Sequence, residues 1–269
     1  MDYGLHNPMD IMTAATPQVE FEPEISINVS SLLWATVIVG VIAAALFFVF
    51  PAIDLDTSAF FYMGDGNFYG RGTDRIFSPT TDIDALRLAI YVASVVVCLG
   101  AGIGLVASAV GKRAIFDLSS VKWLFLTLCL ALGPGLVANV ILKDHWGRAR
   151  PAQIVEFGGT KTYSPPLLLS HQCARNCSFV AGEPSAVFTT FFAAAFLFPS
   201  FSRRLFAAGI VGGMLAGLLR ISQGAHFLSD VIFAGIAMSI TVAVVHLIFE
   251  AAGRADRRKA DPDSSSTTA

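Results

Sequence analysis

Long apolar stretches separated by short polar segments are the dominant pattern along this chain. A helix needs about 20 residues to cross a hydrocarbon core of about 30 Å. The stretches that we expect to span a membrane are residues 31–50, 86–109, 123–142, 184–199, 205–221 and 229–250. The pattern therefore predicts an all-α integral membrane protein with six transmembrane helices.

The composition supports this class and suggests how the chain is divided. Hydrophobic residues make up 54% of the 269 residues and charged residues only 14%, which is too apolar for a soluble domain of this length. Residues 1–29 carry acids and prolines but no Lys or Arg, so we expect a disordered acidic tail there. We expect the six-span domain over 30–252 and a basic, polar tail over 253–269. Because no secretory signal pattern precedes it, the first span is expected to be an uncleaved anchor.

Basic residues in the short loops predict the orientation. Lys and Arg lie between the second and third spans, between the fourth and fifth spans, and after the sixth span. The positive-inside rule places all three segments on the cytoplasmic side. An equal number of Lys and Arg falls on the opposite side, and we interpret several of these as held there for chemistry.

Three basic residues are predicted to meet at the outer ends of the spans. Lys143 ends the third span, Arg150 follows seven residues later, and Arg220 ends the fifth span. Clustered ammonium and guanidinium groups match phosphate oxygens, and charges at a membrane boundary are functional candidates. The start of the fourth span adds the positive end of a helix dipole, and Gly182 allows the backbone to approach a ligand closely. The pattern predicts a phosphate site.

Two further side chains supply a nucleophile and its partner. His226 and Asp230 are four residues apart, a spacing that brings side chains onto one face of a helix. A carboxylate bonded to one ring nitrogen fixes the tautomer and leaves the other nitrogen free to attack phosphorus. Because the three bases neutralise charge, this chemistry requires no metal and no other cofactor. Glu183, at the start of the fourth span, is the candidate acid for the departing oxygen.

The chain resembles the type 2 phosphatidic acid phosphatases, membrane lipid phosphatases related in fold to the vanadium-dependent haloperoxidases. Their pattern is K-x6-R-P, then P-S-G-H, then S-R-x5-H-x3-D. Lys143 and Arg150, with the proline after it, match the first element, and Arg220, His226 and Asp230 match the third. The resemblance implies a haloperoxidase-like helical bundle in which the three bases bind phosphate, the histidine is the nucleophile and the aspartate orients it.

Two departures from the family pattern concern the same site. Leu219 stands where the third element begins with Ser, and residues 180–183 read V-A-G-E where the second reads P-S-G-H. We expect Glu183 to replace the missing histidine as general acid. The alternative is a decayed second motif in a protein that binds a lipid phosphate without hydrolysing it.

The Gly-Glu form of the second motif is similar to a bacterial subgroup that acts on lipid A, particularly the 4′-phosphatases. The resemblance implies a phosphorylated membrane lipid as substrate. It implies the bilayer as partner and no nucleic acid. The active site is expected to face the periplasm from the bacterial inner membrane. Phosphatidylglycerophosphate and undecaprenyl diphosphate are the alternative substrates. An enzyme using bound vanadate is a third class, which the membrane spans disfavour.

Some residues of the outer segment have no assigned role at this stage. Arg148 could contact substrate or lie in the headgroup layer. Cys173 and Cys177 could form a disulfide in an oxidising periplasm, although a bridge over so short a loop needs suitable geometry. Zinc binding by these cysteines and His171 is disfavoured because a fourth ligand is missing.

Overall fold

The described chain is helical apart from one small hairpin. The computed structural model describes residues 27–71 and 81–260, with side chains to residue 255. The helices are α1 Val29–Val49, α2 Ala52–Ala59, α3 Asp82–Gly111, α4 Ser120–Leu130, α5 Lys143–His145, α6 Gly182–Leu197, α7 Ser202–Ser222 and α8 Leu228–Ala260. A π-helix, η1 Ala131–Leu142, joins α4 to α5, and short 3-10 turns are η2 Pro151–Gln153, η3 Val155–Phe157 and η4 Pro199–Phe201. Strands β1 Tyr62–Gly64 and β2 Asn67–Phe68 pair antiparallel.

Among the described residues, five helices are long and apolar enough to cross a membrane. They are Val29–Val49, Asp82–Gly111, Ser120–His145, Pro199–Ser222 and Leu228–Ala255, and each coincides with a span expected from the sequence. The remaining expected span is α6, whose 16 residues reach about 24 Å at 1.5 Å per residue. The all-α membrane fold is confirmed, whereas the count of six spans stays a prediction.

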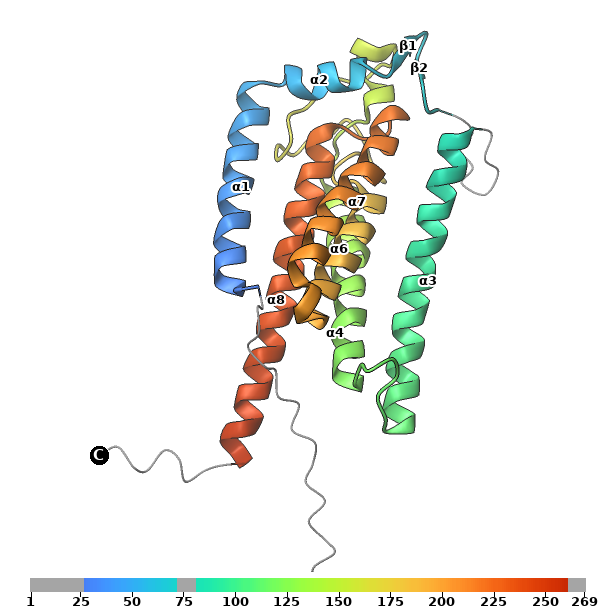
Figure 1. Cartoon of the computed structure of the whole chain (residues 1–269). Coiled ribbons are helices and arrows are strands. Elements are labelled where there is room, and N and C mark those ends of the chain that lie inside the picture. The colour runs from blue at the N-terminus through green and yellow to red at the C-terminus, as the bar shows by residue number, and fades with distance from the viewer. Residues whose placement is uncertain (1–26, 72–80, 261–269) are drawn as a thin grey trace, which may run out of the picture.

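Helix α6 is the centre of the bundle (Figure 1) and packs against α4, η1, α7 and α8. Phe188, Phe192 and Phe196 recur every four residues and are buried, which forms an apolar stripe. A Cβ at Gly213 of α7 would lie 2.4 Å from the Phe188 ring, so the glycine permits this close packing. The tight packing fixes the position of the first turn of α6, at the outer end of the bundle.

Helix α3 lies at the edge of the bundle (Figure 1) and is mostly exposed. Near its C-terminal end a Cβ at Gly104 would lie 2.6 Å from the Trp123 ring of α4. The helix contacts α6 and α7, and its first turns are polar, with Asp84 buried and Arg87 half-buried. These polar residues belong to the site described below.

Helix α2 and the hairpin cover the outer end of the bundle (Figure 1). Phe68 of β2 packs with Phe157 and Phe227 in a small second core. Residues 52–85 appear in the sequence only as a polar stretch, because α2 is too short to show a helical period and the hairpin strands have three and two residues.

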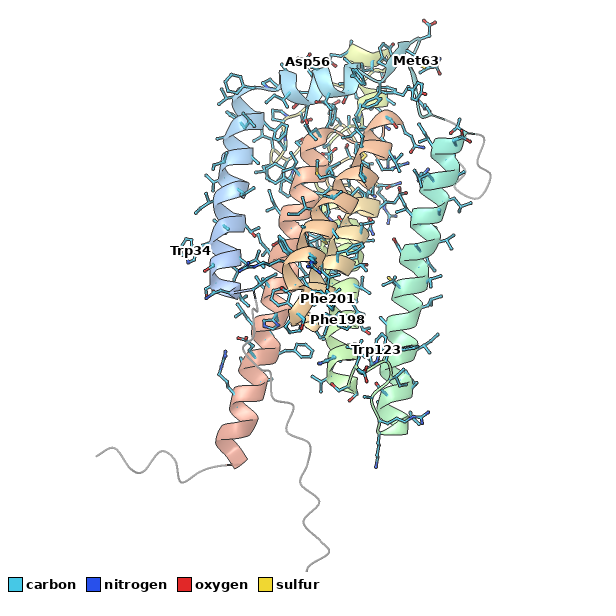
Figure 2. The ribbon with its side chains drawn as sticks, in the orientation of Figure 1. Trp34, Asp56, Met63, Trp123, Phe198 and Phe201 are labelled. Carbon is cyan, nitrogen blue, oxygen red and sulfur yellow. A yellow bond between two sulfur atoms is a disulfide. The ribbon has the colours of Figure 1, made fainter. Side chains whose placement is uncertain are left out.

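The structure brings the loops that were expected on one side of the membrane to one end of the bundle. The predicted cytoplasmic loops lie at the end where α3 and α6 finish and where α4 and α7 begin. Figure 2 places Trp34, Trp123, Phe198 and Phe201 toward that end, whereas Asp56 and Met63 lie at the other. Aromatic side chains at membrane boundaries are common.

The expected tails fall partly outside the described residues. Residues 1–26 and 261–269 are not described, and α1 begins at Val29. The Asn28 side chain caps α1 by accepting a hydrogen bond from the Ser31 amide at 3.0 Å. The domain boundary expected at residue 252 lies inside α8, which continues to Ala260.

Candidate active site

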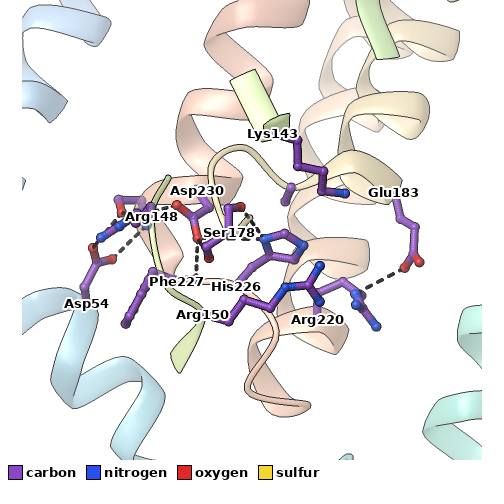
Figure 3. Close-up of polar contacts among 12 residues, drawn as sticks. Asp54, Lys143, Arg148, Arg150, Ser178, Glu183, Arg220, His226, Phe227 and Asp230 are labelled. Carbon is purple, nitrogen blue, oxygen red and sulfur yellow. Dashed lines mark hydrogen bonds and ion pairs between the residues drawn. The ribbon is translucent and has the colours of Figure 1, made fainter. Parts of the chain in front are cut away.

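A polar cavity of about 510 Å³ opens at the outer end of the bundle. Its lining comprises Arg71, Asp84, Arg87, Lys143, Arg150, Ala152, Gln153, Arg175, Asn176, Glu183, Arg220, Gln223, Gly224, Ala225 and His226. Lys and Arg outnumber carboxylates in this lining, as a phosphate site requires. Of the residues expected from the sequence, the cavity brings together Lys143, Arg150, Glu183, Arg220 and His226 (Figure 3).

The His226 ring has one nitrogen committed to the protein. Its Nδ1 lies 2.7 Å from the backbone oxygen of Ser178. A carbonyl oxygen only accepts, so Nδ1 carries the hydrogen and Nε2 keeps its lone pair. Burial lowers the pKa of His226 to about 3, the positive charges of Lys143 and Arg150 act in the same direction, and Asp230 opposes them. The ring is therefore neutral at neutral pH, which is the form that can attack phosphorus.

Asp230 holds the histidine indirectly. Its Oδ2 is 3.8 Å from His226 Nδ1, which is too long for a hydrogen bond. The carboxylate instead accepts from the Ser178 hydroxyl at 2.5 Å and from the Phe227 amide at 2.8 Å. The two residues lie together as their spacing predicted, but the ring's direct partner is Ser178, which the sequence reasoning did not single out.

Arg148 is a structural residue of this site, because its side chain is fully buried and does not line the cavity. Its guanidinium donates to Asp54 at 2.8 Å and to Asp230 at 2.5 Å, and it lies 4.4 Å from the centre of the Phe227 ring. Burial alone would lower the pKa of Arg148, but the two carboxylates raise it. Neither role considered from the sequence applies: Arg148 fixes Asp230.

Asp54 of α2 is a second residue that holds this site in place, and the sequence reasoning missed it. Its fully buried carboxylate accepts from the Ser229 amide and hydroxyl at 2.8 and 2.6 Å and from the Tyr163 hydroxyl at 3.1 Å. Together with Arg148 these contacts tie α2 to the start of α8. An acid directly after an apolar span is the signal that could have found it.

Gly182 provides space for the Lys143 ammonium. A Cβ at this position would lie 2.8 Å from Lys143 Nζ and 2.9 Å from Asn139 Oδ1. Asn139 is fixed by donating to the Pro134 oxygen at 2.7 Å. The ammonium therefore lies against the first residue of α6, and the approach of the Gly182 backbone to a bound phosphate stays a prediction.

Arg150 is held by the segment before α6. Its Nη2 donates to the backbone oxygen of Asn176 at 2.8 Å, and the Asn176 amide donates to Asp144 at 3.0 Å. Cys173 and Cys177 form a disulfide, which answers the open question and leaves neither thiolate for zinc. The bridge closes a short loop directly around Asn176.

Glu183 lies between two arginines. Its Oε1 is 2.9 Å from Nη2 of Arg87 and its Oε2 is 3.4 Å from Nε of Arg220. Arg220 also donates to Gln223, whose amide donates to Asp84 at 3.0 Å. Arg87 is one of the basic residues that the sequence places on the outer side, but the motifs assign it no role because it lies in α3, far from them in sequence.

Comparisons with known proteins agree with this geometry. The PAP2 superfamily model matches residues 122–254. A lipid A 4'-phosphatase of Francisella tularensis subsp. novicida is 46% identical over 129 residues, which cover 46% of this chain and 56% of that protein. Lipid A 4'-phosphatases of Rhizobium leguminosarum and Rhizobium etli are 32% and 30% identical to this chain. Each alignment spans 77% of this chain, and the two alignments span 91% and 82% of the respective relatives. No solved structure matches the chain.

Fold, site and relatives together define the class: a bacterial multi-pass helical membrane protein with a basic cavity at one end of its bundle. The chain belongs to the PAP2 superfamily. This confirms the resemblance that the motifs indicated, including its similarity to the lipid A 4′-phosphatases. The roles of the individual residues stay predictions.

Proposed function

We propose that this chain is a metal-independent phosphatase that removes the 4′-phosphate of lipid A, with its cavity facing the periplasm from the inner membrane. The family and the names of the three relatives support the reaction and the substrate. The observation that carries the mechanism is the His226 ring, whose Nδ1 is bonded to Ser178 so that Nε2 remains available within a basic cavity.

In the first step, Nε2 of His226 attacks phosphorus, and the bond between phosphorus and the sugar oxygen breaks. Lys143, Arg150 and Arg220 bind the phosphoryl oxygens and stabilise the charge that develops on them. Glu183 gives a proton to the departing sugar oxygen. The product is a phosphohistidine and a lipid with a free hydroxyl.

In the second step, water attacks the phosphohistidine. The Glu183 carboxylate takes a proton from this water, the nitrogen to phosphorus bond breaks, and inorganic phosphate leaves. Asp54, Arg148 and Asp230 keep the nucleophile in place through Ser178. The basic side chains supply the charge neutralisation, so the proposal requires no metal.

Phosphate release by the purified protein tests this proposal. Lipid A, phosphatidylglycerophosphate, undecaprenyl diphosphate and phosphatidic acid would be compared in detergent containing a chelator. We expect release from lipid A, confined to the 4′ position as read by mass spectrometry, and a loss of at least about 1,000-fold in His226→Ala, since a covalent mechanism has no substitute for its nucleophile.

Each other result excludes one part of the proposal. Equal phosphate release by the intact protein and by His226→Ala would exclude His226 as the nucleophile. Preferential release from one of the other lipids would keep the reaction and change the substrate. Binding of lipid A without release from any lipid would favour the non-hydrolytic binder.

A further inference from the structure

The segment 176–178, shortly before α6, connects the stretch that carries the first motif with the proposed nucleophile. The Cys177 amide donates to the Lys143 oxygen at 3.0 Å, and the Ser178 amide donates to the Arg148 oxygen at 2.9 Å. Ser178 also lies next to the histidine ring and accepts its hydrogen bond (Figure 3). The segment therefore fixes where the first motif lies relative to the nucleophile.

Asn176 is the residue of this segment that holds Arg150. Nη2 of Arg150 donates to the Asn176 backbone oxygen at 2.8 Å and to its side-chain Oδ1 at 3.1 Å. Two acceptors on one residue restrict the rotation of a long side chain, which lowers the entropy that a bound ligand has to remove. A guanidinium carries more N–H donors than this contact uses, and Arg150 lines the cavity. The contact thus directs the guanidinium without preventing it from binding an anion.

The loop that carries Asn176 depends on its own connections for order. The φ of Asn176 is 51°, in the left-handed region that Asn adopts more readily than most residues. Residues 174–176 are exposed, so packing contributes little to their order. The Asn176 amide donates to Asp144 at 3.0 Å, and a disulfide joins Cys173 to Cys177 across the loop. Such a bridge removes many of the conformations open to the residues between its ends.

We propose that the disulfide and Asn176 together position Arg150 for phosphate binding, so that the site is complete only while the bridge is closed. The proposal rests on the function proposed above, since it treats Arg150 as a phosphate ligand. Cys177 is fully buried and is held by the Lys143 oxygen, whereas Cys173 is half-buried. Opening the bridge releases the exposed part of the loop, and with it both acceptors of Arg150. Asn176 is thus a positioning residue that acts on phosphate through the arginine.

Inorganic phosphate, the proposed product, is the probe, and calorimetry measures its binding to the purified protein in detergent. Dithiothreitol opens the bridge: its two thiols are oxidised to a cyclic disulfide, and Cys173 and Cys177 are reduced to thiols. We expect the phosphate Kd to rise roughly tenfold on reduction, because a charge-assisted hydrogen bond from Arg150 is weakened. The measurement uses a Cys98→Ser background, which removes an exposed free thiol.

A cycle of variants shows whether the effect passes through Arg150. In Arg150→Gln, reduction should change the phosphate Kd by less than about twofold, because the side chain that the loop holds is absent. The same lack of response is expected when Cys173→Ser is combined with Cys177→Ser, which leaves no bridge to open. An equal rise in Kd with and without the arginine would show a general structural role of the bridge and overturn the proposal.

Variants of Asn176 separate its backbone from its side chain. Asn176→Gly and Asn176→Ala both lose the Oδ1 acceptor, but glycine adopts a φ of 51° without strain, whereas alanine does not. We expect Asn176→Gly to lose about threefold in phosphate affinity and Asn176→Ala about tenfold, because only glycine keeps the backbone oxygen in place. Ala174→Ser, in the same loop, is the matched control and should bind phosphate as the intact protein does. Equal affinity of all three variants would contradict the role of Asn176.

Reduction acts on the folded protein, so the test holds even if the double serine variant does not fold. Circular dichroism follows the reduced protein, and a loss of helix would also assign the bridge a structural role and overturn the proposal. An unchanged phosphate Kd on reduction, or no phosphate binding by the oxidised protein, would overturn it as well. Because phosphate binding needs no hydrolysis, failure of the phosphatase assay and failure of this proposal are separate results.

Discussion

At the scale of single residues, the geometry of this site is set by the hydrogen bonds that its side chains make within the protein. Ser178 uses its carbonyl for His226 and its hydroxyl for Asp230. The family pattern names the histidine and the aspartate but not the serine between them in space. The spacing of His226 and Asp230 predicted their proximity, whereas the path through Ser178 arises from a loop 48 residues earlier in the chain.

Gly182→Ala should reduce activity without unfolding the protein. The new Cβ would lie 2.8 Å from Lys143 Nζ, and the flexible lysine would move away from the phosphate. Losing one charge-assisted hydrogen bond costs about 1.5–3 kcal/mol, so we expect kcat/KM on lipid A to fall roughly 10- to 100-fold. Gly102→Ala, with no neighbouring atom within 4 Å, is the control. Equal activity of both variants would show that Lys143 needs no space there.

His226 should make the protein less stable in acid. Its pKa of about 3 in the folded protein lies below the ordinary value of 6.5, so the unfolded chain binds the proton more readily. The stabilisation is complete above about pH 6.5 and is lost as pH falls toward 3. Between pH 7 and pH 5 the intact protein should lose roughly 2 kcal/mol more than His226→Asn. Thermal unfolding in detergent measures this, and parallel curves for the two proteins would contradict it.

At the scale of elements, periodicity and length decide what a sequence reveals. The long apolar runs predicted α1, α3, α7 and the start of α8 within a few residues, because each must cover a membrane core. The C-terminal end of α8 continues to Ala260, past the expected end at residue 250. Helix α2 was missed since its eight residues show no apolar run, and its role depends on one buried acid. The role of Arg87 could not be predicted for a similar reason: only packing of α3 against α6 and α7 brings it to the cavity.

Asp54→Asn should destabilise the protein far more than Asp56→Asn on the same helix. Asp54 shares the fully buried Arg148 with Asp230, and removing one partner of a buried ion pair costs about 3–5 kcal/mol. Asp56 is exposed, so its variant should stay within about 0.5 kcal/mol. Thermal unfolding compares the two. Similar losses in both would mean that α2 is not fastened through Arg148.

At the scale of the whole molecule, the fold gathers residues from distant segments at one end of a bundle. Residues from α3, the segment before α6, α7 and the turn before α8 all line one cavity. The motifs supplied the proposed phosphate ligands and the proposed nucleophile, because their spacing follows from adjacent helix ends. The anchors on α2 and α3 are tertiary contacts that no local spacing encodes.

The orientation of the bundle decides which leaflet supplies the substrate, and cysteine labelling tests it. Lys161 lies at the cavity end and Lys112 at the opposite end, and both are exposed. In cells with a permeabilised outer membrane, a membrane-impermeant maleimide should label Lys161→Cys and should label Lys112→Cys only after lysis, with Cys98→Ser as background. The Cys173 to Cys177 disulfide belongs to the same end as Lys161, and an oxidising compartment is where such a bond persists. The reverse labelling pattern would show that the cavity faces the cytoplasm and would exclude periplasmic lipid A as its substrate.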